Sequence, residues 1–348
     1  MTRIRTRDGI ELAYESMGDP DAPPVILIMG LGAQMHVWPT SLCQRIVNAG
    51  YRVIRFDNRD TGRSSSLDGH GNPSLIRVWL GRRFKRNPRV PYTLKDMSRD
   101  VLALMDELKL PSAHLVGASM GGMIAQILAA RKRRRVRSLT SIMSSASAPR
   151  IPVSQIQVML QLARRPANRD RDEHIRYIAR MNQVIGSPGY PMSDEEIQRL
   201  AETSWERMSS PLGFKRQLVA ITHAGDRRRL LRKIKARTLV IHGADDPLIP
   251  VTMGIETASL IPRAKLKIIL GMGHDFPEAL VPKLSKILIR HLDKSEDHWN
   301  KTQRQKAHNS VHAEDTVARA IDPDDPLSWL DPQNGEYPHP KNNSHRSG

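Results

Sequence analysis

The chain has 348 residues, 39% of them hydrophobic, and carries a formal net charge of +18. This length is enough for one large core with an insertion or a tail. The single cysteine, Cys43, excludes an intramolecular disulfide and is typical of a reducing compartment. No apolar segment of the kind found in signal peptides follows Met1, and no stretch approaches the roughly 18 apolar residues of a membrane span. We therefore expect a cytoplasmic protein.

The positive charge is concentrated outside the C-terminal segment. Residues 293–348 carry seven Lys/Arg and ten Asp/Glu, which leaves a net charge of +21 on residues 1–292. Such a charge favours anionic partners. We expect an enzyme with an arginine-rich surface, and a weak association with anionic membranes is the alternative. Nucleic-acid binding is disfavoured, because aromatic residues make up only 4% of the chain and no nucleic-acid motif is present.

Short apolar runs of strand type alternate with helical patterns through most of the chain. Several runs are continuously apolar, as in strands that are covered on both faces. This alternation predicts an α/β fold with a mostly parallel central sheet and helices on both faces. The predicted strands are residues 25–29, 51–56, 114–116, 139–143, 238–241 and 266–270, and the predicted helices are residues 94–108, 252–260 and 278–291.

Two regions break this alternation. Between two predicted strands, residues 149–229 show no strand and suggest amphipathic helices at 156–163, 174–184 and 194–207, which predicts a helical cap inserted over the sheet. Residues 293–348 are rich in Asn, His, Asp and Pro and show no periodicity, which predicts a disordered tail. The predicted organisation is a first core part (1–148), the cap (149–229), a second core part (230–292) and the tail (293–348).

A G-x-S-x-G match centred on Ser119 is the most informative motif. The apolar run 113–116 precedes it, and a helix-like run, 122–128, follows. A strand, a sharp turn carrying serine and a helix form the setting in which this motif presents a nucleophile above a sheet. Gly117 and Gly121 leave room for the two backbones to pass closely. We therefore predict Ser119 to be a nucleophile.

Asp246 and His274 each follow a predicted strand, as Ser119 does. The carboxyl ends of the strands are where a parallel α/β sheet keeps its crevice. A serine hydroxyl is a poor nucleophile until an imidazole takes its proton, and that imidazole needs a carboxylate on its other nitrogen. The developing oxyanion needs preformed N–H donors, and the backbone amides of Leu31 and Met120 are placed to supply them. The three side chains therefore predict a Ser-His-Asp triad.

These motifs resemble the α/β-hydrolase superfamily, and more narrowly bacterial esterases of the aclacinomycin methylesterase-like and mycobacterial lipase/esterase-like kind. The resemblance spans roughly residues 8–292 and is specific for the fold and triad rather than for the substrate. The matching segments are Val25–Trp38, Val53–Ser65, His114–Gln126, Thr238–Pro250 and Gly271–Asp275.

The resemblance implies an α/β-hydrolase fold and assigns roles to particular residues. The family spacing after the strand-ending Gly243 selects Asp246 over Asp245 as the triad acid. The implied site is completed by Ser119 as nucleophile, His274 as base, and the amides of Leu31 and Met120 as oxyanion hole.

Several other polar residues have structural interpretations. Asp57, Arg59 and Asp60 fit a turn held by side-chain bonds to backbone. His242 is interpreted as a core or turn histidine, whereas His36 fits the site and loop packing equally well. The cations placed to rim the site are Arg82, Arg83, Lys85 and Arg86, whereas the basic cluster 131–135 is expected at the opposite end of the sheet.

The leading functional hypothesis is a serine hydrolase of carboxylic esters, with lipid esters and thioesters as variants. One alternative keeps the triad but uses peroxide, as in cofactor-free haloperoxidases and perhydrolases. An alternative of another class is a protein that binds an anionic surface or nucleic acid on a hydrolase scaffold. We expect no cofactor and no metal, and a small-molecule ester as substrate; the acyl chain, the alcohol and the oligomeric state stay open.

Overall fold

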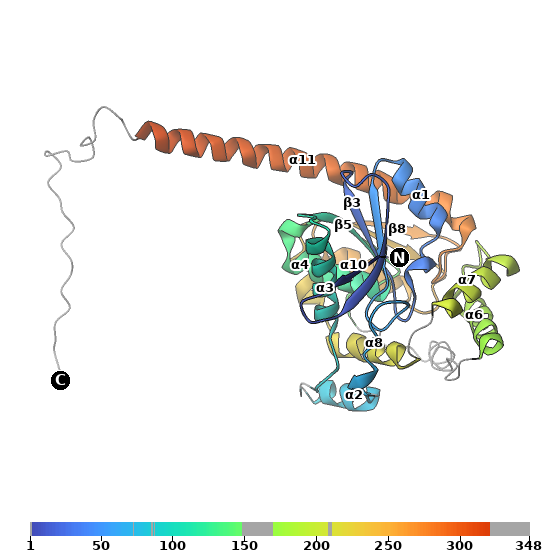
Figure 1. The fold of residues 1–348 in the computed structure, drawn as a ribbon. Helices are drawn as coiled ribbons and strands as arrows, with labels where there is room; N and C mark the ends of the chain where they lie inside the picture. The colour runs from blue at the N-terminus through green and yellow to red at the C-terminus, as the bar shows by residue number, and fades with distance from the viewer. Residues whose placement is uncertain are drawn as a thin grey trace, which may run out of the picture. The chain divides into compact units, whose positions relative to one another are not determined.

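The computed structural model describes residues 2–71, 73–84, 86, 88–147, 170–207 and 211–320. Its centre is an eight-stranded sheet in the order β1-β2-β4-β3-β5-β6-β7-β8 (Figure 1). The β1–β2 and β2–β4 pairs are antiparallel, and every pairing from β4 through β8 is parallel. The strands are β1 Thr2–Arg5, β2 Glu11–Met17, β3 Pro24–Ile28, β4 Arg52–Phe56, β5 Ala113–Ala118, β6 Val136–Ile142, β7 Arg237–Gly243 and β8 Lys265–Ile269.

The predicted fold class is confirmed, and each of the six predicted strands has its counterpart in β3 to β8. β1 and β2 are additional strands at the sheet edge. β1 is exposed at every position except Ile4, and charged residues such as Arg3 and Glu11 interrupt the pattern. An edge hairpin buries little apolar surface, so its sequence carries no continuous apolar run.

Alternate side chains of the central strands enter two separate cores, one on each face of the sheet. On β3, Val25 and Leu27 face α1 and the start of α11, whereas Ile26 and Ile28 face α3 and α4. The resulting arrangement of helix, sheet and helix is visible in Figure 1. Covering on both faces accounts for the continuous apolar run of this strand, in which all five residues are buried.

The helices lie where the alternating pattern predicts them, with several additions. The stretch 94–108 forms α3, which begins with a capping box between Thr93 and Asp96. The 252–260 stretch forms α10. The core helices are α1 Thr40–Asn48, α2 Leu75–Arg83, α3 Leu94–Glu107, α4 Met120–Arg131 and α10 Val251–Leu260, with short 3-10 turns η1 Met35–Val37, η2 Asp68–His70, η3 Arg133–Arg135 and η5 Glu278–Leu280.

The described part of the predicted cap is helical. It comprises residues 170–207 and 211–229, and two of its helices match the predicted segments 174–184 and 194–207. The segment 156–163 lies outside the described residues. The helices of this region are α6 Arg171–Ile185, α7 Asp194–Glu206, α8 Pro211–Ala224 and α9 Arg228–Leu231.

The expected disorder from residue 293 onward is wrong for residues 293–320. Helix α11 runs from Val281 to Ala320, beyond the predicted end of the last core helix. The sequence between Pro282 and Pro323 contains neither proline nor glycine, so nothing in it interrupts a helix. The disorder-like composition of the segment as a whole comes largely from residues after Pro323, and residues 321–348 lie outside the described residues.

The part of α11 just past residue 292 belongs to the hydrolase body. The body spans Met1–Glu296, and the remainder of the chain forms a second compact unit. Glu296 accepts a hydrogen bond from buried His114 at 2.9 Å and pairs with Arg137 at 2.7 Å. The other ring nitrogen of His114, Nδ1, forms a 2.7 Å hydrogen bond with the Ser138 hydroxyl. These contacts fix α11 to the amino-terminal ends of β5 and β6.

Replacing Glu296 with alanine is therefore expected to lower the free energy of unfolding by about 1–3 kcal/mol, because it leaves His114 without its partner inside the body. Asp297 is the matched control: it is the neighbouring acid and is exposed. Asp297→Ala should change stability by less than about 0.5 kcal/mol. Urea denaturation of both variants measures the difference. Equal effects would contradict the anchoring role of Glu296.

Candidate active site

Ser119 lies on a strained turn between β5 and α4. Its backbone has φ 53° and ψ −119°, a region that non-glycine residues rarely adopt. A Cβ on Gly117 would lie 2.3 Å from the carbonyl oxygen of Gly121, and a Cβ on Gly121 would lie 2.0 Å from that of Ile28. Both glycines are therefore required for the strand and helix to pass this closely, as the motif predicts.

Hydrogen bonds hold the strained serine backbone on both sides. The Ser119 amide donates to the Ile142 carbonyl at 2.9 Å, and the Ser144 hydroxyl donates to the Ser119 carbonyl at 2.7 Å. A strained residue costs of order 1–3 kcal/mol and persists only where its surroundings fix it. Here β6 and the turn after it hold the Ser119 backbone in place.

Asp246, rather than Asp245, contacts His274. The His274 Nδ1 atom lies 2.7 Å from Asp246 Oδ2. The other oxygen, Asp246 Oδ1, accepts hydrogen bonds from the amides of Leu248 at 2.9 Å and Ile249 at 2.8 Å. Asp245 is exposed and instead accepts from a backbone amide of the loop after β8. The structure thus brings together Asp246 and His274, as predicted, at the carboxyl ends of β7 and β8.

The electrostatics keep the Asp246 carboxylate ionised. Burial of this group acts to raise its pKa, but the charge of His274 and the hydrogen bonds from His242, His274 and the Ile249 amide outweigh it and hold the pKa at about 2. His242 is fully buried and bonds the Ile249 carbonyl at 2.8 Å, which agrees with its interpretation as a core histidine. An ionised acid beside an imidazole is suited to stabilise the protonated ring.

Leu31 and Met120, whose backbone amides are predicted to form an oxyanion hole, both belong to segments next to Ser119. A Cβ on Gly30 would lie 3.1 Å from the Ser119 Cβ atom, so the turn leading to Leu31 is in contact with the serine. Met120 is the first residue of α4, where helix amides lack an intrahelical acceptor. Within the described residues, neither the Leu31 nor the Met120 amide donates to a protein acceptor, and the Ser119 hydroxyl and His274 ring form no hydrogen bond with each other.

Gln217 on α8 is a residue of the site that the sequence interpretation missed. It is fully buried, and its Oε1 atom accepts from the Gly32 amide at 2.7 Å, next to Leu31. Its Nε2 atom donates to the Arg59 carbonyl at 2.8 Å and to the Thr61 hydroxyl at 2.7 Å. The amide side chain therefore ties the turn holding Leu31 to the loop after β4. A contact across 185 positions of the chain leaves no local pattern.

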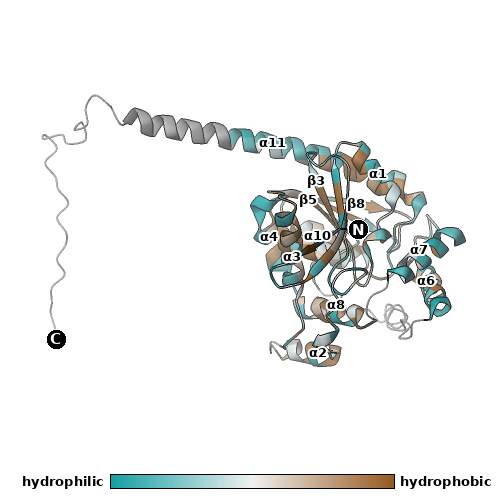
Figure 2. Ribbon diagram, viewed as in Figure 1, coloured by the Kyte–Doolittle hydropathy of each residue, from teal (hydrophilic) through white to brown (hydrophobic). Residues whose placement is uncertain are grey.

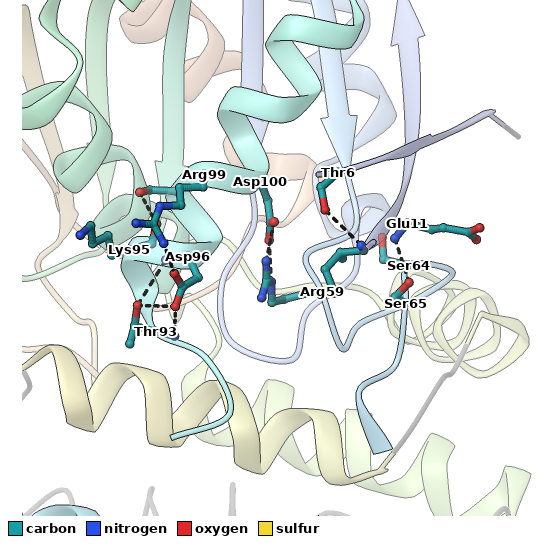
Figure 3. Close-up of polar contacts among 12 residues, drawn as sticks. Thr6, Glu11, Arg59, Ser64, Ser65, Thr93, Lys95, Asp96, Arg99 and Asp100 are labelled. Carbon is teal, nitrogen blue, oxygen red and sulfur yellow. Dashed lines mark hydrogen bonds and ion pairs between the residues drawn. The ribbon is translucent and has the colours of Figure 1, made fainter. Parts of the chain in front are cut away.

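The polar loop after β4 is held by its side chains, as predicted, but ion pairs between side chains add to the expected bonds to backbone. Arg59 pairs with Asp100 on α3 through two hydrogen bonds of 2.6 and 2.5 Å, drawn in Figure 3. Asp60 pairs in the same two-pronged way with buried Arg216 on α8. Asp57 accepts bonds from the amides of Met35 at 2.8 Å and Arg63 at 2.9 Å, and from Arg207 after α7 at 2.7 Å.

His36 and Cys43 lie outside the Ser119, Asp246 and His274 set. Burial, together with the charge of Arg207, lowers the pKa of His36 to about 4, so this ring is neutral near pH 7. Burial raises the pKa of the Cys43 thiol to about 11, as expected of an unreactive thiol. Among the described residues, no three His, Cys, Asp or Glu side chains cluster as metal ligands do.

The loop that carries His274 is held by the end of α6. The His274 amide donates to the Ile185 carbonyl at 2.7 Å. Its neighbour Asp275 accepts a hydrogen bond from the Ser187 hydroxyl and a longer one, 3.4 Å, from Asn182. Burial raises the pKa of Asp275 to about 6. The α6 region and the histidine loop therefore form one packed unit.

The chain belongs to the alpha/beta hydrolase fold family, whose model matches residues 23–278. It is 27% identical over 325 residues to a rhodomycin D methylesterase of Streptomyces sp. (strain C5), covering 83% of this chain and 97% of that protein. It is also 27% identical over 302 residues to a non-heme chloroperoxidase of Kitasatospora aureofaciens, covering 83% and 98%.

Solved structures share the fold. An esterase from Exiguobacterium antarcticum aligns with a TM-score of 0.66 at 20% identity, over 84% of this chain and 99% of that one. A hydrolase from Pseudomonas aeruginosa aligns with a TM-score of 0.61 at 23% identity, over 84% and 97%. The family model and the methylesterase relative confirm the resemblance to α/β-hydrolase esterases expected from the sequence.

Gln217→Leu is expected to lower kcat for ester turnover by roughly tenfold to a hundredfold with a smaller change in KM. The reason is that removing an oxyanion donor outright costs about 10²–10³, and the substitution would only displace the Leu31 amide, the predicted donor. Thr61→Val is the matched control, because it removes a bond from the same network and keeps the bond to Gly32. It should change stability more than kcat. Equal kcat losses in both variants would contradict a positioning role for Gln217.

The raised pKa of Asp275 gives stability a pH dependence of known sign. Between about pH 4 and pH 6 the folded state binds the proton that the unfolded state has released, so the Asp275 contribution to stability is lost as pH rises through this window. Asp275→Asn removes this contribution. The variant should be more stable than wild type by about 1–3 kcal/mol at pH 7.5 and similar to it at pH 4. Denaturant unfolding at both pH values measures this, and a pH-independent difference would contradict it.

Proposed function

We propose that the chain hydrolyses carboxylic esters through an acyl-enzyme on Ser119, with His274 as general base and Asp246 as its acid partner. The observation that carries the proposal is the 2.7 Å contact between His274 Nδ1 and Asp246 Oδ2. This pair lies after β7 and β8, at the same edge of the sheet as the strained Ser119 turn after β5. The methylesterase relative supports the same reaction class.

In this mechanism the contact with Asp246 leaves the Nε2 atom of His274 to take the proton of the Ser119 hydroxyl. The serine oxygen attacks the ester carbonyl, and the carbonyl oxygen becomes an oxyanion that the amides of Leu31 and Met120 stabilise. The imidazolium returns its proton to the departing alcohol. Water then attacks the acyl-enzyme by the same route and releases the acid, while Asp246 stays ionised throughout.

A methyl ester of a carboxylic acid is the substrate class to test first, because the methylesterase relative covers most of both chains. Lipid esters and thioesters are variants of the same acyl transfer. The reaction needs a small-molecule ester, water and no cofactor, and it suits the cytoplasmic location that the sequence predicts.

The chloroperoxidase relative favours a second candidate activity on the same residues. Hydrogen peroxide in place of water would attack the acyl-enzyme and release a peracid, with the proton again passing through His274. The peracid would then oxidise halide without a metal. Peroxide-dependent bromination in the presence of a carboxylic acid tests this activity, and its loss in Ser119→Ala would assign it to the same nucleophile.

Ser119→Ala is expected to abolish both ester turnover and labelling by a fluorophosphonate probe. Asp246→Asn should lower kcat by several orders of magnitude, because replacing the triad acid of a serine protease by its amide costs about 10⁴ through the wrong imidazole tautomer. Asp245→Asn is the matched control and should stay within about tenfold. Unchanged turnover in Ser119→Ala, or the reverse ranking of the two aspartates, would contradict the proposal.

A further inference from the structure

Helix α2 exposes an unusual set of large apolar side chains. Ile76 is 70% exposed, Trp79 59%, Leu80 40% and Phe84, just past the helix, 68%. We call these four residues the α2 apolar face. Among the described residues, the other exposed large apolar side chains are Ile255, Ile268 and Leu270. In Figure 2, α2 lies at the periphery of the body and is drawn in a mixture of brown, pale and teal segments.

The α2 apolar face points away from the body. Val78 is only 3% exposed, and α2 packs against α8 (Figure 1). At about 100° per residue, Ile76 and Leu80 fall about 160° from Val78, on the opposite side of the helix, and Trp79 lies on the flank, about 100° from Val78. Contiguous apolar side chains on a surface mark an interaction site more often than isolated ones do. α2 therefore contacts the body through Val78 and α8, and the α2 apolar face stays available to a partner.

The charges within the sequence stretch that carries this face have one sign. Residues 69–95 contain no Asp or Glu. Arg77, Arg86 and Arg89 are described and exposed. The cations of this stretch are Arg77, Arg82, Arg83, Lys85, Arg86, Arg89 and Lys95. A partner of this surface must therefore accept apolar side chains and carry negative charge.

We propose that α2 and the basic stretch after it bind the surface of an anionic phospholipid bilayer. Trp79 and Phe84 enter the boundary between headgroups and acyl chains, where aromatic rings are favoured, and the arginines contact the headgroups. A second copy of the chain is disfavoured as the occupant, because pairing these surfaces would bring like charges together. None of the helices in the described part of the chain has the length and apolar character of a membrane span.

The position of α2 links this surface to the candidate active site. α2 packs on α8, and α8 carries Gln217, whose side chain bonds the Gly32 amide beside Leu31. A bilayer on α2 would therefore lie on the active-site side of the sheet. If the proposed ester hydrolysis is correct, esters dissolved in the bilayer are then available to the site, but the binding itself does not depend on catalysis.

Co-sedimentation of the full chain with vesicles tests the proposal. The Ser119→Ala variant is used, so that hydrolysis plays no part in the result. We expect binding to vesicles of phosphatidylglycerol and phosphatidylcholine, and little binding to phosphatidylcholine alone. Trp79→Ser/Phe84→Ser should weaken binding at least tenfold at unchanged melting temperature. The matched control, Ile255→Ser/Leu270→Ser, removes two exposed apolar side chains elsewhere and should leave binding unchanged.

Two variants that lose the same charge distinguish binding through the basic stretch near α2 from binding through the net positive charge of the whole protein. Arg77→Gln/Arg86→Gln/Arg89→Gln should weaken binding roughly a hundredfold. The control removes the same charge from Arg131, Arg133 and Arg134, which are exposed at the end of α4 and just after it, at the opposite end of the sheet. It should leave binding within about threefold, because charges beyond a Debye length are screened.

Three results would overturn the proposal. They are no sedimentation with anionic vesicles, equal losses in the two arginine variants, and unchanged binding after Trp79→Ser/Phe84→Ser. Light scattering measures the oligomeric state of the protein. If the protein is a dimer and Trp79→Ser/Phe84→Ser dissociates it, the α2 apolar face binds a second copy of the chain instead. Binding by a protein that hydrolyses no ester would leave this inference standing and remove the proposed function.

Discussion

The left-handed backbone of Ser119 is the constraint on which the rest of the site depends. A residue with φ 53° is retained only because the Ile142 carbonyl and the Ser144 hydroxyl hold its amide and carbonyl. The glycines on either side allow β5 and α4 to approach closely enough for this turn. The same geometry sets the Met120 amide at the start of α4, so a single strained turn fixes both the serine and the amide that we propose as one oxyanion donor.

The helices inserted between β6 and β7 form part of the frame of the site. The end of α6 bonds the His274 loop, and Gln217 on α8 bonds the turn that carries Leu31. Arg207, after α7, pairs with Asp57 on the loop after β4. Each of these three loops is therefore held from two directions, by the sheet and by the inserted helices. We infer that changes in these helices alter turnover as well as substrate choice.

Much of the fold was predictable because the physical causes are local. Continuous apolar runs such as β3 follow from burial on both faces, and the glycines of the Ser119 turn follow from close backbone approach. The pairing of Asp246 with His274 was predictable because family spacing and strand ends placed both residues.

The features that the sequence did not predict have identifiable reasons. Gln217 acts across a long sequence separation and has no motif. β1 is a mostly exposed edge strand without an apolar run. The extension of α11 was hidden by a composition averaged over two different segments, although the absence of proline and glycine between Pro282 and Pro323 was the available signal. The exposure of Trp79 and Phe84 depends on how α2 packs, which periodicity alone does not fix.

The most direct test of the central claim is to trap the covalent intermediate. A methyl or p-nitrophenyl ester is mixed with the protein and quenched with acid within milliseconds, and the digested protein is analysed by mass spectrometry. The account predicts the acyl group on the peptide containing Ser119, with an amount that decays as the free acid forms. Ester turnover with no acylated Ser119, or an acyl group on another residue such as Cys43, would contradict it.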